Sequence, residues 1–335
     1  MNHSRPGIVS ISLFLLVSCF ALILLFSLSL YGNSVTNRIE AFTVKKGESV
    51  ADIARKLDNL QILNNHFYTI FLIKIMNLEN KIKAGIYEFD VGESRKQVLE
   101  KLTYGRQKLF SVTFLEGSTY RQIREEIKTS LYLKEVLVEK KLIENFFDFE
   151  TGGIEGLFFP DTYFYMANTE STDILKLASK RMASVIKTEW SNRSSSIEKV
   201  IKNPYEALIL ASIVEKEAVL SSEKPLIAGV FIKRLQNNMR LQADPTVIYA
   251  IGDKYNGNIK RFHLKIDSPY NTYRKKGLPP TPIGAPGQDA LRAVLNPLLL
   301  DYLYFVSKND GSHKFSKTLE EHNQAVDYYQ KRKKK

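Results

Sequence analysis

The sequence predicts an α+β protein with an N-terminal transmembrane helix, a small α/β subdomain, and a larger mixed α+β domain with a loop-lined cleft. Three observations predict this fold class. A charge-free apolar segment lies near the N-terminus, a strand–turn–helix pattern recurs after it, and amphipathic helices then alternate with turn-rich aromatic segments. The chain has 335 residues, 44% of them hydrophobic and 25% charged, which fits one large domain or two to three ordinary ones with buried cores.

The apolar segment covers residues 8–31 and contains no charge. At about 1.5 Å per residue, a helix of this length crosses a hydrocarbon core of about 30 Å. A cleaved signal peptide has a shorter apolar region of about 7–15 residues, so we expect a single-pass anchor followed by a large secreted-type domain. The stretch LVSC, ending at Cys19, resembles a lipoprotein cleavage box, but apolar residues follow it directly. Basic residues are too evenly placed on the two sides to fix the orientation.

Composition and charge argue against several classes of protein. Part of the net charge of +12 comes from the end of the chain, and we expect residues 328–335 to form a basic, disordered tail. The remaining charge forms no arginine-rich stripe and favours phospholipid or an anionic wall polymer over nucleic acid. A single cysteine excludes internal disulfides, and five histidines without an HExxH or HxH pair predict no metal site.

A strand, a glycine turn and a capped helix recur three times after a polar linker at residues 32–40. Ser49, Ser94 and Thr119 are the expected N-caps, and each is followed three residues later by Asp or Gln, as in a capping box. The spacings between the copies are unequal, which indicates a recurring βα unit and not a solenoid. We assign residues 41–106 to the small subdomain.

The first copy, FTVKKGESVADIARKL, resembles the opening of a LysM module. That module is a small β-α-α-β fold that binds polymers of N-acetylglucosamine, so the resemblance implies a sugar-binding role for this LysM-like subdomain. The alternative is that V-x-x-G-E-S is simply a good turn from a strand into a helix.

The larger domain, residues 107–327, opens with a segment dense in aromatic and turn residues. Hydrophobic periodicity then predicts helices over residues 173–189, 204–219 and 223–236. Residues 237–317 are rich in Tyr, Pro, Gly and Asn, a composition typical of loops packed around a cleft.

The helix at residues 204–219 carries the main candidate for chemistry. Asn203 is a good N-cap and is followed by proline, which fits the first helical position. At about 100° per residue, Glu217 falls in the middle of the apolar arc, whereas Glu215 and Lys216 fall outside it. The pattern therefore predicts that Glu217, and not Glu215, points toward the interior or a cleft.

A carboxyl group in such a place has a raised pKa and can donate a proton near neutral pH. The alternatives are a buried glutamate paired with a cation, and a helix end where the apolar arc meets solvent. A site that cleaves glycosides needs such an acid, and most families add a second carboxylate. Asp161 and Asp267 fit turns, and Asp244 fits the N-cap of a short helix, so none is compelling as that partner. A single catalytic glutamate suffices if the substrate supplies its own nucleophile.

Four long motifs of this sequence are similar to those of a known family. They are ASIVEKEA, RLQNNMRLQADPTVIYAIG, SPYNTYRKKGLPPTPIGAPG and HKFSKTLEEHN. With the anchor and the LysM-like segment, they resemble the MltG (YceG-like) family of endolytic murein transglycosylases over almost the whole chain. The resemblance implies a lyase of the bacterial inner membrane whose catalytic domain lies in the periplasm or outer wall space, which places residues 1–7 in the cytoplasm. Such a lyase cuts the β-1,4 bond between N-acetylmuramic acid and N-acetylglucosamine inside glycan strands, leaves 1,6-anhydro ends and needs no cofactor. It also implies a role alongside penicillin-binding peptidoglycan synthases.

The resemblance further implies roles for individual residues. The family's catalytic glutamate matches Glu217, which would protonate the leaving oxygen and then accept the proton of the muramoyl C6 hydroxyl. Ala218 follows it where many members have Thr or Ser, which puts a hydroxyl contact in doubt. We expect substrate contacts from Gln242, Asp244, Asn271, Tyr273, His313 and Asn323, each of which also fits a turn, core or strand-end role. Two rival functions are a hydrolytic muramidase and a non-catalytic LysM-type scaffold that binds the wall.

Overall fold

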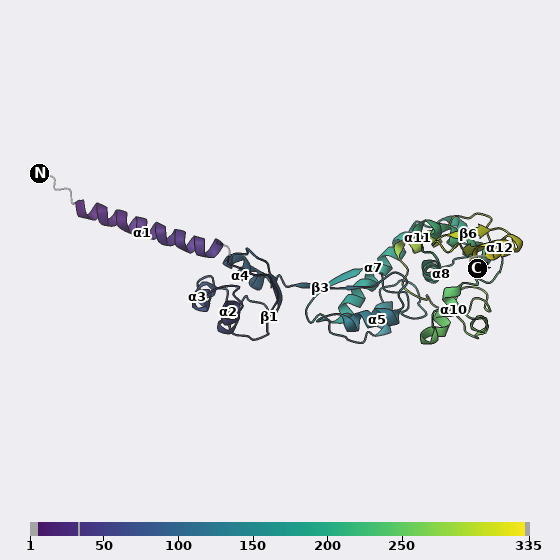
Figure 1. The fold of residues 1–335 in the computed structure, drawn as a ribbon, viewed down its shortest axis with the longest axis horizontal. Helices are drawn as coiled ribbons and strands as arrows, with labels where there is room; N and C mark the ends of the chain where they lie inside the picture. Colours follow the sequence, from purple (N-terminus) through teal and green to yellow (C-terminus); the bar gives the residue numbers. More distant parts are fainter. Residues whose placement is uncertain (1–5, 33, 332–335) are drawn as a thin grey trace. The chain divides into compact units, whose positions relative to one another are not determined.

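The structure is a computed structural model that describes residues 6–32 and 34–331 (Figure 1). The chain divides into two compact units, Met1–Phe110 and Ser111–Lys335, where we expected a boundary after residue 106. The fold is mixed α+β with an N-terminal apolar helix, as predicted. The expected cytoplasmic N-terminus falls largely, and the end of the basic tail wholly, outside the described residues.

The first unit begins with α1 (Pro6–Tyr31), the predicted apolar helix. Among the described residues, this is the one helix long and apolar enough to cross a membrane, and its composition fits either an anchor or a signal sequence. It is followed by β1 (Ile39–Val44), α2 (Val50–Asn59), α3 (His66–Ile75), β2 (Gly85–Phe89) and α4 (Arg95–Tyr104). The two strands pair antiparallel, and α2 packs against α3.

The end of α1 is built into the core of the first unit. Leu30 is 7% exposed and Val35 is 3% exposed, and both belong to the same buried cluster as Phe42, Leu72 and Tyr87. The backbone amides at positions 34 and 35 both donate to one carbonyl in the turn before α4. The beginning of the expected linker is therefore part of the packed subdomain, because its apolar side chains have a core to enter.

The capping residues were correctly predicted from the sequence. Ser49 accepts a hydrogen bond from a backbone amide in the first turn of α2. Ser94 and Thr119 each form a complete capping box, with Gln97 and Gln122 respectively. These bonds satisfy amide groups that have no partner within the helix, which is why a short polar motif fixes where each helix begins.

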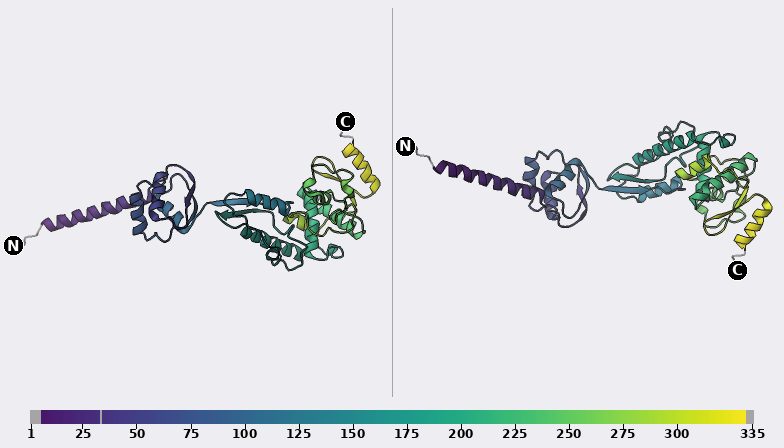
Figure 2. Two further views of the ribbon diagram at one scale, coloured as in Figure 1. Left: turned by 90° about the horizontal axis from the view of Figure 1, so that it is seen from below. Right: turned by 90° about the horizontal axis from the view of Figure 1, so that it is seen from above.

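The second unit holds most of the helices. Its elements are β3 (Leu109–Thr113, which spans the boundary), α5 (Tyr120–Thr129), α6 (Lys140–Glu144), β4 (Thr162–Met166), α7 (Ser171–Ser191), α8 (Pro204–Glu217), α9 (Lys224–Gln236), α10 (Asp244–Ile251), α11 (Gln288–Leu295), β5 (Tyr304–Ser307), β6 (His313–Ser316) and α12 (Leu319–Val326). β3 pairs with β4, and β5 pairs antiparallel with β6. Figure 2 shows α12, in yellow, at the C-terminal end of this unit, where it packs on the β5–β6 hairpin.

Helix α8 is the central element of the second unit. It contacts α7, α9, α10 and α11, and every residue from Tyr205 to Val214 is buried except Glu206. The side chain of Asn203 accepts a hydrogen bond from the Glu206 amide at 2.9 Å, which confirms the predicted N-cap. Because helices surround it, α8 has no solvent-exposed stripe along most of its length.

Two parts of the C-terminal region differ from expectation. Helix α11 lies inside the stretch expected to be loops, and it packs on both α8 and α9. Residues 327–331 form a π-helical turn where a disordered tail was expected to begin. The side chain of Gln330 donates to the Ser307 carbonyl at 3.1 Å, so this turn is held against β5.

Candidate active site

Glu217 is the last residue of α8, and its side chain is partly buried within the second unit. Loss of hydration raises the pKa of this carboxyl to about 8, and the negative charge of Asp244 acts in the same direction. The backbone N–H of Asp244 and the guanidinium of Arg234 lower the pKa, with smaller effects. Near neutral pH the carboxyl therefore holds its proton while keeping some exposed surface, and both properties suit a general acid.

Asp244 and Tyr273 form one side of the cluster around Glu217. The Tyr273 hydroxyl donates to Asp244 Oδ1 at 2.6 Å. Burial raises the pKa of Tyr273, and the hydrogen bond to Asp244 adds to the increase. Asp244 was expected to cap α10, but the N-cap is Ala243 and no side chain caps this helix. The carboxylate of Asp244 is instead turned to the tyrosine.

Arg234 forms hydrogen bonds that connect the elements around this cluster. Its side chain is 7% exposed. The guanidinium donates to the carbonyl of Leu303 at 2.7 Å, to the carbonyl of Leu241 at 2.7 Å and to Gln242 Oε1 at 3.4 Å. It therefore fixes the loop before α10 to α9 and to the start of the β5–β6 hairpin. Its charge also favours the ionised form of Glu217.

Glu215 is not on a polar face, and the prediction that only Glu217 points inward is wrong. The side chains of Glu215 and Lys224 are 5% and 4% exposed, and their charged atoms lie 2.7 Å apart. Glu215 Oε2 also accepts the backbone N–H of Gly287 at 2.8 Å. The helical-wheel argument failed because four helices pack around α8, so the face that carries Glu215, opposite the apolar arc, also meets protein.

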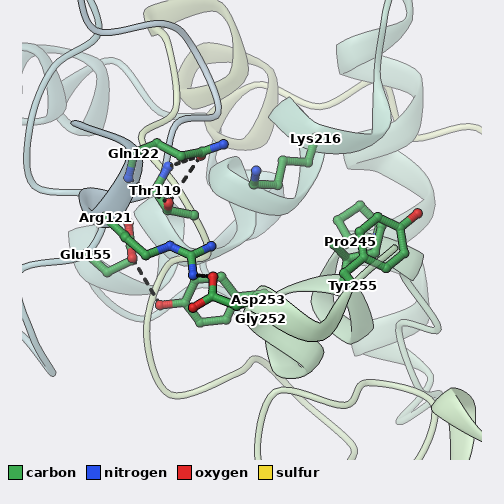
Figure 3. Close-up of a pocket in the computed structure, with 11 residues that line it drawn as sticks. Thr119, Arg121, Gln122, Glu155, Lys216, Pro245, Gly252, Asp253 and Tyr255 are labelled. Carbon is green, nitrogen blue, oxygen red and sulfur yellow. Dashed lines mark hydrogen bonds and ion pairs between the residues drawn. The ribbon is translucent and has the colours of Figure 1, made fainter. Parts of the chain in front are cut away.

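A pocket of about 730 Å³ lies near the cluster, although Glu217, Asp244 and Tyr273 are not among the residues that line it (Figure 3). Lys216 and Pro245 line it, and these two residues directly neighbour Glu217 and Asp244 in the chain. Figure 3 shows Lys216 and Pro245 on one side of the pocket and Glu155 on the other. The pocket is large enough for about one or two sugar rings, since ligand sites commonly span about 300–1,000 Å³.

Glu155 is a second carboxyl with a raised pKa in this region. Burial raises the pKa, while the backbone N–H of Tyr120 and the hydroxyl of Tyr249, which donate to it at 2.8 Å and 3.0 Å, lower it. Desolvation lowers the pKa of Lys216, although the negative charge of Glu155 opposes this. The pocket thus presents an acid and a partly desolvated amine to any ligand that enters it.

The structure brings four of the predicted site residues into one cluster. Glu217, Asp244 and Tyr273 interact electrostatically with one another, and Gln242 joins them through Arg234. Gln242 is exposed and has a positive φ of 52°, which turns the chain sharply just before α10. This grouping could not be read from the sequence, because the residues come from three separate segments.

The other predicted site residues have different surroundings. The side chain of Asn271 is fully buried and donates to the carbonyls of Leu264 and Ile266, so it holds the loop that carries Tyr273. His313 lies with Nδ1 2.7 Å from Glu223 Oε2, which joins the β5–β6 hairpin to the start of α9. Asn323 is exposed on α12.

Sequence reasoning missed Arg234, Glu155 and Lys216 as members of the site. For Arg234 a signal was present. It lies three residues after Phe231 and seven after Ile227, on the face of α9 that is buried, so the wheel used for α8 would have placed it inside. Glu155 gave no such signal, because it lies in an irregular segment where periodicity does not apply. Within residues 6–32 and 34–331, no three His, Cys, Asp or Glu side chains gather as a metal site would require.

A carboxyl that keeps its proton, set at the end of a central helix beside a sugar-sized pocket, defines a candidate acid–base site in an α+β domain. Comparison with known sequences agrees with that class. A sequence model of the YceG-like family matches residues 42–328, so the chain belongs to the YceG-like family.

Relatives and a solved structure support this membership. The chain is 33% identical to the endolytic murein transglycosylase of Bacillus subtilis (strain 168), over 90% of this chain and 89% of the relative. It is 30% identical to the endolytic murein transglycosylase of Streptococcus pneumoniae serotype 2 (strain D39), over 84% of this chain and 57% of that longer protein. The crystal structure of a putative YceG-like protein from Listeria monocytogenes matches with a TM-score of 0.54 and 30% identity, covering 86% of this chain and 98% of that one. Murein transglycosylases of this kind are enzymes of the lyase type.

Proposed function

We propose that this protein is a membrane-anchored endolytic murein transglycosylase. It would cleave the β-1,4 bond between N-acetylmuramic acid and N-acetylglucosamine within glycan strands and leave 1,6-anhydro ends. The observation that carries the proposal is the carboxyl of Glu217, whose pKa of about 8 keeps it protonated at neutral pH beside a pocket of suitable size. The names of the relatives supply the substrate class.

In this mechanism Glu217 acts first as a general acid. It protonates the glycosidic oxygen as the bond to the muramoyl C1 breaks, and the leaving sugar departs with a free hydroxyl. The 2-acetamido group of the substrate supports the cationic carbon, so no protein nucleophile is needed. Glu217, now ionised, accepts the proton of the C6 hydroxyl while that oxygen bonds to C1. The group is thereby restored, and no water is consumed.

The other groups of the cluster would position the substrate. Tyr273 and Asp244 are hydrogen-bonded to each other, and Asp244 remains an acceptor for sugar hydroxyl or amide groups. Gln242 is exposed at the sharp turn before α10 and can donate to a carbonyl oxygen. His313 and Asn323 would contact more distant parts of a strand. A sugar ring held this way keeps its C6 hydroxyl close to C1, which favours ring closure over attack by water.

Hydrolysis of the same bond is the second candidate function, and one observation favours it. Asp244 is close enough to raise the pKa of Glu217, so the cluster contains a second carboxylate that could activate water. Under the lyase proposal Asp244 binds and positions substrate. Under hydrolysis by inversion it would be the general base, and Asp244→Asn would abolish turnover entirely.

The test is to incubate the full-length protein in detergent with purified glycan strands and to identify the new ends by mass spectrometry. The proposal predicts that the wild type and the control variant form ends lighter by one water molecule than reducing ends. Glu217→Gln should lower the rate by about 10²–10⁴-fold, the contribution typical of a general acid–base group. Glu215→Gln is an unsuitable control because that residue is buried in an ion pair, so Glu206→Gln, at the opposite end of α8, is the matched variant.

Three results would overturn the proposal. Reducing ends alone would show a muramidase. Equal rates of cleavage by the wild type and Glu217→Gln would show that Glu217 is not the catalytic acid. No cleavage by either protein would favour a scaffold that binds the wall through the LysM-like subdomain.

The cellular placement is part of the same proposal. Helix α1 would remain in the inner membrane as a single-pass anchor, with the rest of the chain in the periplasm or outer wall space. Nascent glycan strands are assembled at that surface, so an anchored enzyme would meet them there. A partnership with penicillin-binding peptidoglycan synthases would follow from this shared location.

A further inference from the structure

Helix α3 carries an apolar face that no part of the first unit covers. Phe67, Phe71 and Ile75 are 74%, 51% and 57% exposed. They are spaced by four residues and therefore lie along one face of the helix. The other face is buried in the core through Thr69, Leu72 and Ile73, so the exposed stripe is not a consequence of a poorly packed helix.

Helix α3 lies next to the candidate membrane helix, which it contacts through Tyr68. Ser29, in the last turns of α1, donates to the Tyr68 hydroxyl at 2.9 Å. Tyr68 also lines a shallow apolar depression together with Cys19, Ile23 and Phe26 of α1. Figure 1 shows α3 on the side of the first unit from which α1 emerges. The last turn of α1 is packed into the core of the same unit, so α3 cannot swing away from α1 without disrupting that core.

Aromatic and basic side chains surround the end of α1. The ammonium of Lys96 lies 4.7 Å from the centre of the Tyr31 ring and 3.1 Å from its hydroxyl. The guanidinium of Arg95 lies 5.3 Å from the centre of the Tyr68 ring. Tyrosine is enriched at the level of lipid headgroups, and lysine and arginine near a membrane surface attract anionic lipids.

We infer that α3 is a second membrane contact, whose Phe67–Phe71–Ile75 face enters the boundary between headgroups and acyl chains of the leaflet that α1 leaves. This inference rests on the proposed anchoring by α1. The partner is a lipid surface, because the helix that carries the apolar stripe contacts the apolar helix α1 through Tyr68, and the nearby charges of Arg95 and Lys96 match anionic headgroups. The first unit would then sit directly on the membrane.

Quenching of tryptophan fluorescence by brominated acyl chains tests this inference in the full-length protein. The chain has a single tryptophan, so Trp190→Phe gives a protein without tryptophan fluorescence, into which each reporter is introduced. Phe71→Trp is the reporter on α3, and Leu22→Trp reports on α1. Phe164→Trp, at a position 65% exposed in the second unit, is the matched control. Each variant is reconstituted into vesicles of phosphatidylethanolamine and phosphatidylglycerol.

The inference predicts strong quenching at positions 22 and 71 and none at position 164. Quenching at position 22 without quenching at position 71 would overturn it while leaving the anchor intact, and would indicate that water, a second copy or another protein covers α3. Loss of quenching at both positions would overturn the anchor and the inference together. Neither outcome depends on glycan cleavage, so failure of the catalytic proposal would be seen separately.

Discussion

At the scale of single residues, the protonation of Glu217 controls the proposed chemistry. The reaction starts from the protonated carboxyl, so its rate follows the protonated fraction and falls as the pH rises through the pKa of about 8. The negative charge of Asp244 is one cause of that raised pKa. Removing this charge lowers the pKa, and the alkaline fall in rate should then begin at a lower pH.

The corresponding prediction concerns Asp244→Asn. Its residual kcat/KM should decline at a pH lower than that of the wild type, by up to about one pH unit, as expected for loss of one nearby charge. The measurement is kcat/KM for glycan cleavage against pH for both proteins. Asp267→Asn, an exposed aspartate paired with Lys275, should leave the alkaline decline in place. If the alkaline decline of kcat/KM occurred at the same pH in Asp244→Asn as in the wild type, the assignment of this decline to Glu217 would be contradicted.

Sequence reasoning at this scale succeeded where a side chain points in a direction fixed by its own helix. The position of Glu217 followed from the apolar arc of α8. Glu215 was misplaced because its neighbours on the wheel, Leu208 and Ala211, are themselves apolar and fully buried, which already indicated a second inward face. The contacts of Glu217 with Asp244 and Arg234 depend on how three segments meet, and no local pattern encodes that.

At the scale of secondary-structure elements, the ion pair of Glu215 and Lys224 joins α8 to the start of α9. Both side chains are almost completely buried, and the lysine has a second carboxylate, Glu116, at 3.8 Å. A buried ion pair adds little net stability compared with apolar residues, but removing one partner leaves an unpaired charge in the interior. The pair therefore makes the junction sensitive to single substitutions.

Lys224→Met should accordingly lower the free energy of unfolding by about 3–5 kcal/mol. The double variant Glu215→Leu with Lys224→Met should recover part of this loss, because no charge then remains unpaired. Denaturant titration of the three proteins provides the measurement. Lys128→Met, in an exposed pair with Glu125, should change stability by no more than about 1 kcal/mol. If the single and double variants were equally unstable, the cost would lie in packing and not in charge.

The elements themselves were predictable to different degrees. Helices with a clear period, such as α7 and α8, were found close to their observed ends. Helix α11 was missed because its eight residues lie between proline-rich turns and offer barely two helical turns of pattern. It forms by packing on α8 and α9, and tertiary contacts of that kind are not visible in a local window.

At the scale of the whole molecule, the central question is whether α1 stays attached to the rest of the chain. Its apolar part, Leu13–Tyr31, is only 6% buried, whereas Leu30 is inserted in the core of the first unit. Cleavage after the apolar segment would remove Leu30 from that core. The packing therefore favours an anchor that is retained.

We predict that the protein extracted from native membranes with detergent retains residues 8–31, and that it stays in the membrane pellet after washing at alkaline pH. Mass spectrometry of the intact chain checks the first statement, and fractionation checks the second. A mature chain that begins after residue 31 would identify the segment as a signal sequence. Lipid attached to Cys19 would instead support the lipoprotein alternative.

Family membership was also predictable from the sequence, because long motifs rich in rare residues extend over almost the whole chain. The structure explains why one of these motifs contains a glycine. A Cβ atom at Gly284, in the motif PIGAPG, would lie 2.4 Å from the carbonyl oxygen of Gly117, so only glycine allows these two loops to meet beside Lys216. The motif thus encodes a close backbone contact at the edge of the pocket.

The most direct test of the central claim is the titration of Glu217 itself. The carboxylic acid band in the infrared difference spectrum between wild type and Glu217→Gln can be followed from about pH 5 to about pH 10 in the full-length protein. The account predicts that this band persists through neutral pH and disappears with a midpoint near 8. A midpoint near the ordinary glutamate value of about 4.3 would contradict it, because the group would then have no proton to donate at neutral pH.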